Sequence, residues 1–122
     1  MRKTSYDEIS DTLYISYEPD QEATGIELND HILLRIDELR RKLVSITVFD
    51  YSVVAQRTEM GPRSFPLVGL RELPEDLREI TLGILSCAPA NEIFSLSAYT
   101  PSSTHEAIPI TSVQTIPITA EI

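Results

Sequence analysis

The chain of 122 residues has the length of one ordinary domain, and its 42% hydrophobic and 24% charged residues are typical of a soluble globular protein. Its formal net charge is −9, and residues 40–42 form its only basic cluster. We therefore expect no nucleic-acid partner, because phosphate backbones attract clustered Lys and Arg. No hydrophobic run approaches the ~20 residues of a membrane helix, so we expect no membrane partner either.

The cysteine content and the first residues indicate a cytoplasmic protein. Cys87 is the single cysteine, which excludes an intramolecular disulfide framework and suits a reducing compartment. The opening MRKTSYDE turns polar and acidic at once, so we expect no secretory signal. The cytoplasm is therefore the expected location.

The N-terminal half alternates between hydrophobic and polar residues with period two, which predicts half-buried β-strands. The residues expected on the buried face are Leu13, Ile15, Tyr17, Ile26, Leu28, Ile32, Leu34, Ile36, Val44, Ile46 and Val48. Leu43 falls on the opposite face. Between the last two strands, DELRRKL has a helix-favouring composition, but seven residues are too few for a stable helix and a hairpin loop is preferred. Such short connections favour an antiparallel meander of four to five strands over residues 4–54.

The composition of residues 57–72 predicts an ordered connection rather than a flexible linker. The segment contains two Pro and two Gly and shows no sustained period. Its hydrophobic residues nevertheless require burial, and they are Phe65, Leu67, Val68 and Leu70.

One amphipathic helix is predicted over residues 73–87. Pro74 suits the first helical turn, where its missing N–H costs nothing. The expected buried stripe, at spacings i, i+4, i+7 and i+11, consists of Leu73, Leu77, Ile80 and Ile84. Pro89 ends the helix, and Cys87, near its C-terminus, is expected to be an inert small packing residue.

The pattern of residues 92–122 predicts C-terminal strands or an extended arm. The segment EIFSLSAYT alternates like a strand, and IPIT occurs twice, at 108–111 and at 116–119. Pro109 and Pro117 have no N–H for a sheet ladder, so they restrict these segments to an edge or to an extended arm. Together, the expected elements compose a single α+β domain over residues 1–122: a β-meander, one packed helix and additional C-terminal strands.

The first strands carry a resemblance to a known family. YDEISDTLYISY, followed by HILLRID and LVSITVFDYS, resembles the uncharacterised bacterial domain-of-unknown-function family 2283. The matching positions are Tyr6, Asp7, Asp11, Leu13, Tyr14, Ile15, Phe49 and Asp50. The resemblance covers residues 4–54, and the continuation looks like longer members from photosynthetic bacteria. It implies a small β-rich fold and no assigned activity; the turn ELRRK lacks the Gly that is usual before the family's last strand.

The carboxylates of SYDEISD are the candidates for metal binding or proton transfer. Asp7, Glu8 and Asp11 lie within five positions, and Ca²⁺ or Mg²⁺ prefers such oxygen ligands. The preferred interpretation is a hairpin turn in which Asp7 or Asp11 accepts backbone hydrogen bonds, because the segment lacks the further ligands and the Gly of a calcium loop. We therefore expect no metal and no cofactor, with Asp7 and Asp11 as the only candidate ligands.

Two histidines complete the search for chemistry. His31 follows Asp30, but adjacent strand residues point to opposite faces and cannot cooperate. His105 lies close to Ser102 and Ser103 in sequence, yet catalytic triads are rarely assembled from consecutive residues. The catalytic residues, if any exist, are unknown.

Two classes of function are compatible with the sequence. The preferred class is a non-enzymatic protein-interaction or self-assembly module. Such a module is expected to be a homo-oligomer, and an unidentified protein partner is compatible with it. Its interface candidates are Ile108, Ile110, Ile116 and Ile118, which could equally pack on their own sheet. The alternative is a small metal- or ligand-dependent enzyme with a carboxylate site near the first hairpin.

Overall fold

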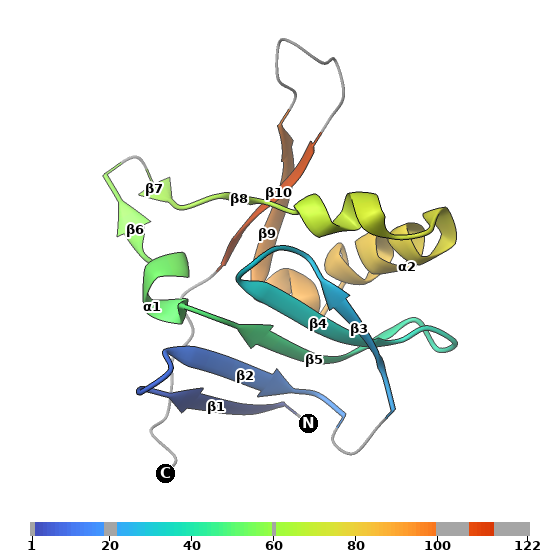
Figure 1. Ribbon diagram of the computed structural model, residues 1–122, viewed down its shortest axis with the longest axis horizontal. Helices are drawn as coiled ribbons and strands as arrows, with labels where there is room; N and C mark the ends of the chain where they lie inside the picture. The colour runs from blue at the N-terminus through green and yellow to red at the C-terminus, as the bar shows by residue number, and fades with distance from the viewer. Residues whose placement is uncertain (1, 19–21, 60, 100–107, 114–122) are drawn as a thin grey trace.

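A five-stranded antiparallel sheet forms the larger layer of the protein. The structure is a computed structural model that describes residues 2–18, 22–59, 61–99 and 108–113. The strands of the sheet are β1 (Lys3–Asp7), β2 (Thr12–Ser16), β3 (Thr24–Glu27), β4 (Ile32–Asp37) and β5 (Lys42–Val48) (Figure 1). The turn at 38–41 between β4 and β5 is the predicted hairpin loop.

The strand order is β1-β2-β5-β4-β3, so the sheet is meander-like with one crossing. β3, β4 and β5 follow one another through short turns, as predicted. β2 pairs with β5 instead of β3, and the chain therefore passes from the middle of the sheet to its far edge before β3 begins.

A β-bulge changes which side chains of β5 face the core. The register shifts between Arg35 and Ile36, so that Ile36 lies opposite Leu43 and Val44 is the extra residue. The carbonyl of Val44 accepts hydrogen bonds from the amides of Tyr17 and Glu18, at 2.9 and 3.3 Å. Leu43 is 5% exposed and belongs to the core, so its predicted place on the opposite face is wrong.

Short elements connect the sheet to the helix. They are α1 (Tyr51–Val54), β6 (Arg57–Thr58), β7 (Gly61–Pro62), β8 (Phe65–Pro66) and η1 (Val68–Glu72). Leu67 and Leu70 are buried as expected, whereas Val68 is 52% exposed. α1 was not expected from the sequence.

The C-terminal half contributes a helix and a second sheet. Its elements are α2 (Glu75–Leu85), η2 (Ala90–Glu92), β9 (Phe94–Tyr99) and β10 (Ile108–Val113). β10 lies between β8 and β9, so the prediction that Pro109 confines its segment to an edge or an arm is wrong. The sheet tolerates this proline because β8 pairs with β10 only at Ile110 and Thr111, while the carbonyl of Pro109 still accepts a hydrogen bond from the amide of Leu67.

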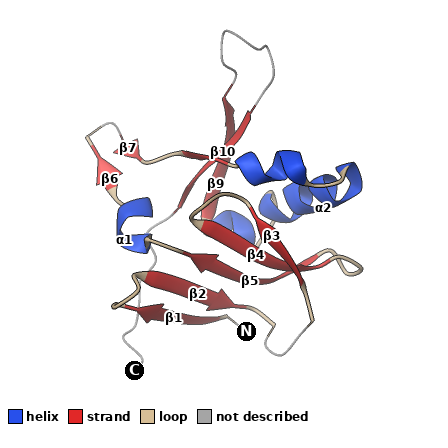
Figure 2. Cartoon of the chain, viewed as in Figure 1, coloured by secondary structure: helices blue, strands red, loops and turns tan. Residues whose placement is uncertain are grey.

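One hydrophobic core joins the two layers. α2 and the three-stranded sheet lie on the side of the molecule away from β1 (Figure 2). The largest fully buried side chains come from both layers: Phe94, Leu13, Ile15, Ile26, Leu28, Ile32, Leu34, Ile36, Ile46, Leu67, Leu70 and Leu85. This arrangement confirms the predicted α+β fold. Within the ranges that the structure describes, no helix is long and hydrophobic enough to cross a membrane.

Candidate functional site

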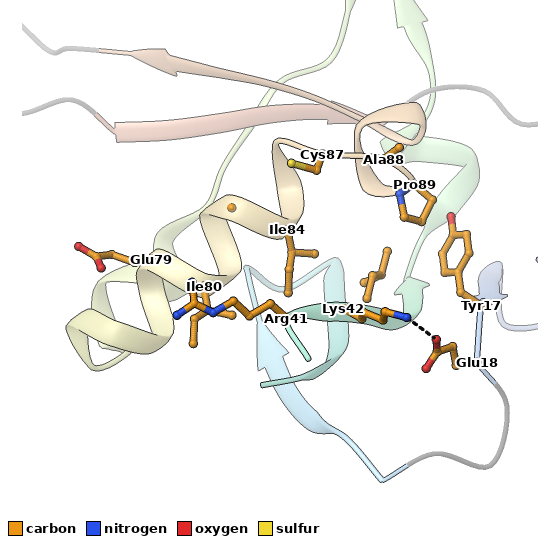
Figure 3. Close-up of a pocket in the computed structure, with 12 residues that line it drawn as sticks. Tyr17, Glu18, Arg41, Lys42, Glu79, Ile80, Ile84, Cys87, Ala88 and Pro89 are labelled. Carbon is orange, nitrogen blue, oxygen red and sulfur yellow. Dashed lines mark ion pairs between the residues drawn. The ribbon is translucent and has the colours of Figure 1, made fainter. Parts of the chain in front are cut away.

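An open groove of about 490 Å³ lies between α2 and the end of the sheet where β2 stops and β5 begins (Figure 3). Its walls come from three separated parts of the chain: residues 17–18, residues 41–43 and residues 79–89. The β4–β5 turn and the residues that follow β2 therefore face α2 across the groove.

The floor of the groove is hydrophobic because the rest of the protein leaves part of the hydrophobic stripe of α2 uncovered. Thr81, Ile84 and Leu85 are the buried residues of α2, while Ile80 is only half-buried and faces the groove. Gly83 adds to the opening, since a Cβ built there would meet no atom within 4 Å. The buried face of α2 is thus rotated relative to the predicted stripe, and Ile80 stays partly accessible in the groove.

The rim of the groove is charged. Lys42 forms an ion pair with Glu18 at 3.9 Å, and Glu79 stands on the helix side (Figure 3). Arg41 has a left-handed backbone, with φ of 55°, and within the described part of the chain its side chain has no ion pair or hydrogen bond. A non-glycine residue in this conformation costs roughly 1–2 kcal/mol. Because Arg41 has no partner among the described residues, the turn presents its guanidinium to solvent beside the hydrophobic floor.

Tyr17 and Cys87 also line the groove, near the helix C-terminus. Burial raises the pKa of Tyr17, and the guanidinium of Arg2 partly offsets this, so the hydroxyl remains a neutral donor. Its oxygen is buried, and no described residue forms a hydrogen bond of good geometry with it. Cys87 is exposed, which corrects its prediction as a packing residue.

The first-hairpin carboxylates lie elsewhere, and each has its own hydrogen-bond partners. Asp7 accepts hydrogen bonds from the amide of Ile9 at 3.1 Å and from the hydroxyl of Ser10 at 2.9 Å. These bonds close the β1–β2 turn. Among the described residues, no three His, Cys, Asp or Glu side chains lie close enough together to hold a metal ion.

Asp11 pins the hairpin to α1. Its carboxylate accepts hydrogen bonds from the hydroxyl of Tyr6 at 2.5 Å, and from the amide and hydroxyl of Ser52 at 3.0 and 2.6 Å. Its own carbonyl accepts one from the amide of Tyr51 at 2.9 Å. The bonds from Ser52 and then Tyr6 lower the pKa of Asp11, and the bond to Asp11 raises the pKa of Tyr6 to about 12.

His31 lies near Asp50 rather than working with Asp30. Its Nδ1 is 3.3 Å from Oδ2 of Asp50, although the orientation is not that of a hydrogen bond, and its ring stands edge-on to Phe65 at 5.6 Å. The side chain of Asn29 accepts hydrogen bonds from the amides of residues 31 and 32. Asp50 was missed as a neighbour of His31, because only the pairing of β4 with β5 brings them together.

The interface candidates are only partly visible. Ile110 is half-buried in β10, and the backbone of Ile108 pairs with Tyr99 of β9. Ile116 and Ile118 lie outside the described residues, as do Ser102, Ser103 and His105. Their role in an interface stays a prediction.

The five-stranded sheet and its hairpins lie in a segment that matches a known family. Residues 3–52 match the family described as protein of unknown function (DUF2283). The match confirms the resemblance seen in the sequence and runs from β1 to the first half of α1. The DUF2283 segment supplies one wall of the groove, while α2 lies outside it. No curated protein and no solved structure matches the chain.

Proposed function

We propose that the protein is a non-enzymatic binding module whose groove receives a hydrophobic side chain from a partner protein. The observation that carries the proposal is the incompletely covered stripe of α2 beside Leu43, with Ile80 half-buried over an open space. Hydrophobic surface of this kind, rimmed by charged side chains, is typical of protein-binding grooves.

The rim indicates the chemistry of the partner. Lys42 already has Glu18 as an ion-pair partner, whereas Arg41 has none within the described residues. In a chain with a net charge of −9, this turn is the one basic cluster of the sequence. A segment with a carboxylate next to a Leu or Ile side chain complements both the guanidinium and the floor.

The enzymatic alternative has less support from the geometry. Asp11 accepts one hydrogen bond from Tyr6 within the hairpin and two from Ser52 that attach the hairpin to α1, while Asp7 accepts the bonds of its own turn. Neither residue lines the groove. Taking up a substrate proton or a metal would compete with these structural hydrogen bonds.

Binding of short labelled peptides tests the proposal. Two sets carry the same central Leu or Ile, flanked by Glu in one set and by Lys in the other, and fluorescence anisotropy measures their affinity. We expect the acidic set to bind, and amide chemical-shift changes to concentrate on residues 41–43 and on α2.

Two variants locate the site. Arg41→Gly removes the cation and also relieves the left-handed backbone, and Gly83→Leu fills the groove from the helix side. Each should weaken binding of the acidic peptides at least about tenfold, which corresponds to ~1.4 kcal/mol. Arg63→Gly, in an exposed loop outside the groove, is the matched control and should bind normally. Equal affinity for both peptide sets, or full binding by Gly83→Leu, would show that the groove is not the site.

A further inference from the structure

We infer that two copies of the chain pair edge to edge through β1, antiparallel, in the register that places Ser5 opposite Ser5 of the second copy. The inference concerns a surface that is separate from the groove, and it stands or falls independently of the proposed function.

The two edges of the five-stranded sheet differ in how they are protected. At the end of β3 the amide of Gly69, in η1, donates to the carbonyl of Leu28 at 2.8 Å. The approach is so close that a Cβ at Gly69 would lie 1.8 Å from the carbonyl oxygen of Glu27. η1 therefore obstructs the C-terminal end of this edge, at Glu27 and Leu28.

β1 has no such cover among the described residues. It pairs with β2 along all five residues and with no other described strand. In Figure 1, β1 forms the margin of the sheet, and α2 and the three-stranded sheet lie at the opposite side of the molecule. A second molecule can therefore approach the outer edge of β1 without meeting these elements.

Two of the devices that prevent edge pairing, a proline and a β-bulge, are absent from this strand. The sequence KTSYD contains no Pro, and its pairing with β2 shows no bulge. Lys3 and Asp7 are exposed and Thr4 and Tyr6 are half-buried, so one face continues the core side of the sheet and the other carries the charges.

The charges select one register. Antiparallel pairing centred on Ser5 places Lys3 opposite Asp7 of the second copy, and Asp7 opposite its Lys3, while Thr4 faces Tyr6. Opposite charges directly across two strands stabilise the pair, and like charges destabilise it. A shift that centres the pairing on Thr4 or on Tyr6 brings Lys3 or Asp7 opposite Ser5 and loses both ion pairs. Lys3 has no ion pair within the described chain and is available for this contact.

The resulting assembly is closed. A two-fold axis perpendicular to the sheet joins two five-stranded sheets into one ten-stranded sheet, with both helical layers on the same side. The edges left at its two ends are those of β3, and η1 obstructs the C-terminal end of each. Because the pairing uses the same β1 edge of both copies, neither copy has a second β1 edge to offer, and the assembly closes as a dimer.

Sedimentation velocity of the untagged protein over a range of concentrations, with charge-reversed variants, tests the inference. The wild-type chain should sediment as a dimer. Lys3→Asp places two carboxylates opposite each other twice, and Asp7→Lys does the same with two ammonium groups, so each variant alone should have its dimer dissociation constant raised at least tenfold. Mixing the two variants in equal amounts restores opposite charges at both positions and should restore the dimer.

Two controls separate this pairing from other causes. Asp7 also holds the β1–β2 turn, so thermal unfolding must show that Asp7→Lys is folded, and recovery in the mixture would itself require a folded strand. Asp30→Lys makes the same substitution in the exposed β3–β4 turn, at the opposite edge of the sheet from β1, and should leave the dimer intact. A monomeric wild type, a mixture that stays monomeric, or equal weakening by Asp30→Lys would overturn the inference.

Discussion

Asp11 shows how one side chain can organise two elements. Its backbone is left-handed, with φ of 54°, a conformation that a short polar side chain adopts at less cost than a branched one. In this position its carboxylate reaches the hydroxyl of Tyr6 within the hairpin and Ser52 in α1, 41 residues away in sequence. The preferred interpretation of the opening carboxylates, a hydrogen bond from a nearby backbone N–H, describes Asp7, whereas Asp11 ties the hairpin to a distant element.

Replacing Asp11 by Asn should lower the melting temperature by several degrees at neutral pH. Asn tolerates the left-handed backbone, but its amide nitrogen cannot accept a hydrogen bond, so either the Tyr6 or the Ser52 contact is lost. Asp30→Asn is the control, because the exposed Asp30 makes no hydrogen bond or ion pair among the described residues. An Asp11→Asn protein as stable as the control would contradict the structural role.

The pKa of Asp11 gives this prediction a pH dependence. The folded-state pKa lies below the ordinary value of 3.8, so the stabilisation is present above that value and is lost as the pH falls through the lower folded-state pKa. Asn does not titrate. The difference in melting temperature between the wild type and Asp11→Asn should therefore shrink as the pH is lowered from about 7 towards 3.

Elements with a strong period could be predicted from the sequence, and elements defined by a local irregularity could not. Alternation located β2, β4 and β5, and the i, i+4 spacing located α2. In LVSITVF, however, Leu43 and Val44 are both hydrophobic, and the sequence contains no mark of the bulge that puts Leu43 into the core. α1 was hidden because YSVV has the composition of a strand.

The contact between η1 and β3 should depend on Gly69. A methyl group at this position would overlap the carbonyl of Glu27, so Gly69→Ala must push η1 away from the sheet edge and should lower the free energy of unfolding by about 1–3 kcal/mol. Gly83→Ala is the matched substitution in open space on α2. It should raise the free energy of unfolding by about 0.5–1 kcal/mol, because alanine favours helix. Urea unfolding measures both values, and a harmless Gly69→Ala would contradict the close packing.

At the scale of the whole molecule, the groove could not be predicted from the sequence. Its walls come from residues 17–18, 41–43 and 79–89, which share no motif and meet only because β2 pairs with β5 and α2 crosses the end of that pair. The hydrophobic stripe of α2 was visible in advance. Its incomplete burial depends on the exact rotation of the helix, which periodicity does not determine.

The same long-range packing leads to a prediction about cooperativity. Ile46 lies in the centre of the five-stranded sheet and Ile93 lies beside β9 in the other layer, and both belong to one core cluster. If the layers unfold as one domain, Ile46→Val and Ile93→Val should each lower the free energy of unfolding by about 0.5–1.5 kcal/mol. Leu39→Val, at the 97% exposed tip of the β4–β5 turn, should leave it unchanged.

Two probes decide whether that loss is shared. Far-ultraviolet circular dichroism follows both sheets and the helix, while the fluorescence of the five tyrosines of this tryptophan-free chain follows tertiary packing. Each core variant should shift one transition, by the same amount with both probes, because the core residues of β5 and β9 contact a common cluster. An Ile93→Val protein in which the two probes separate, with part of the signal melting as in the wild type, would instead mean that the C-terminal layer unfolds on its own from a stable five-stranded sheet. The single-domain interpretation would then be wrong.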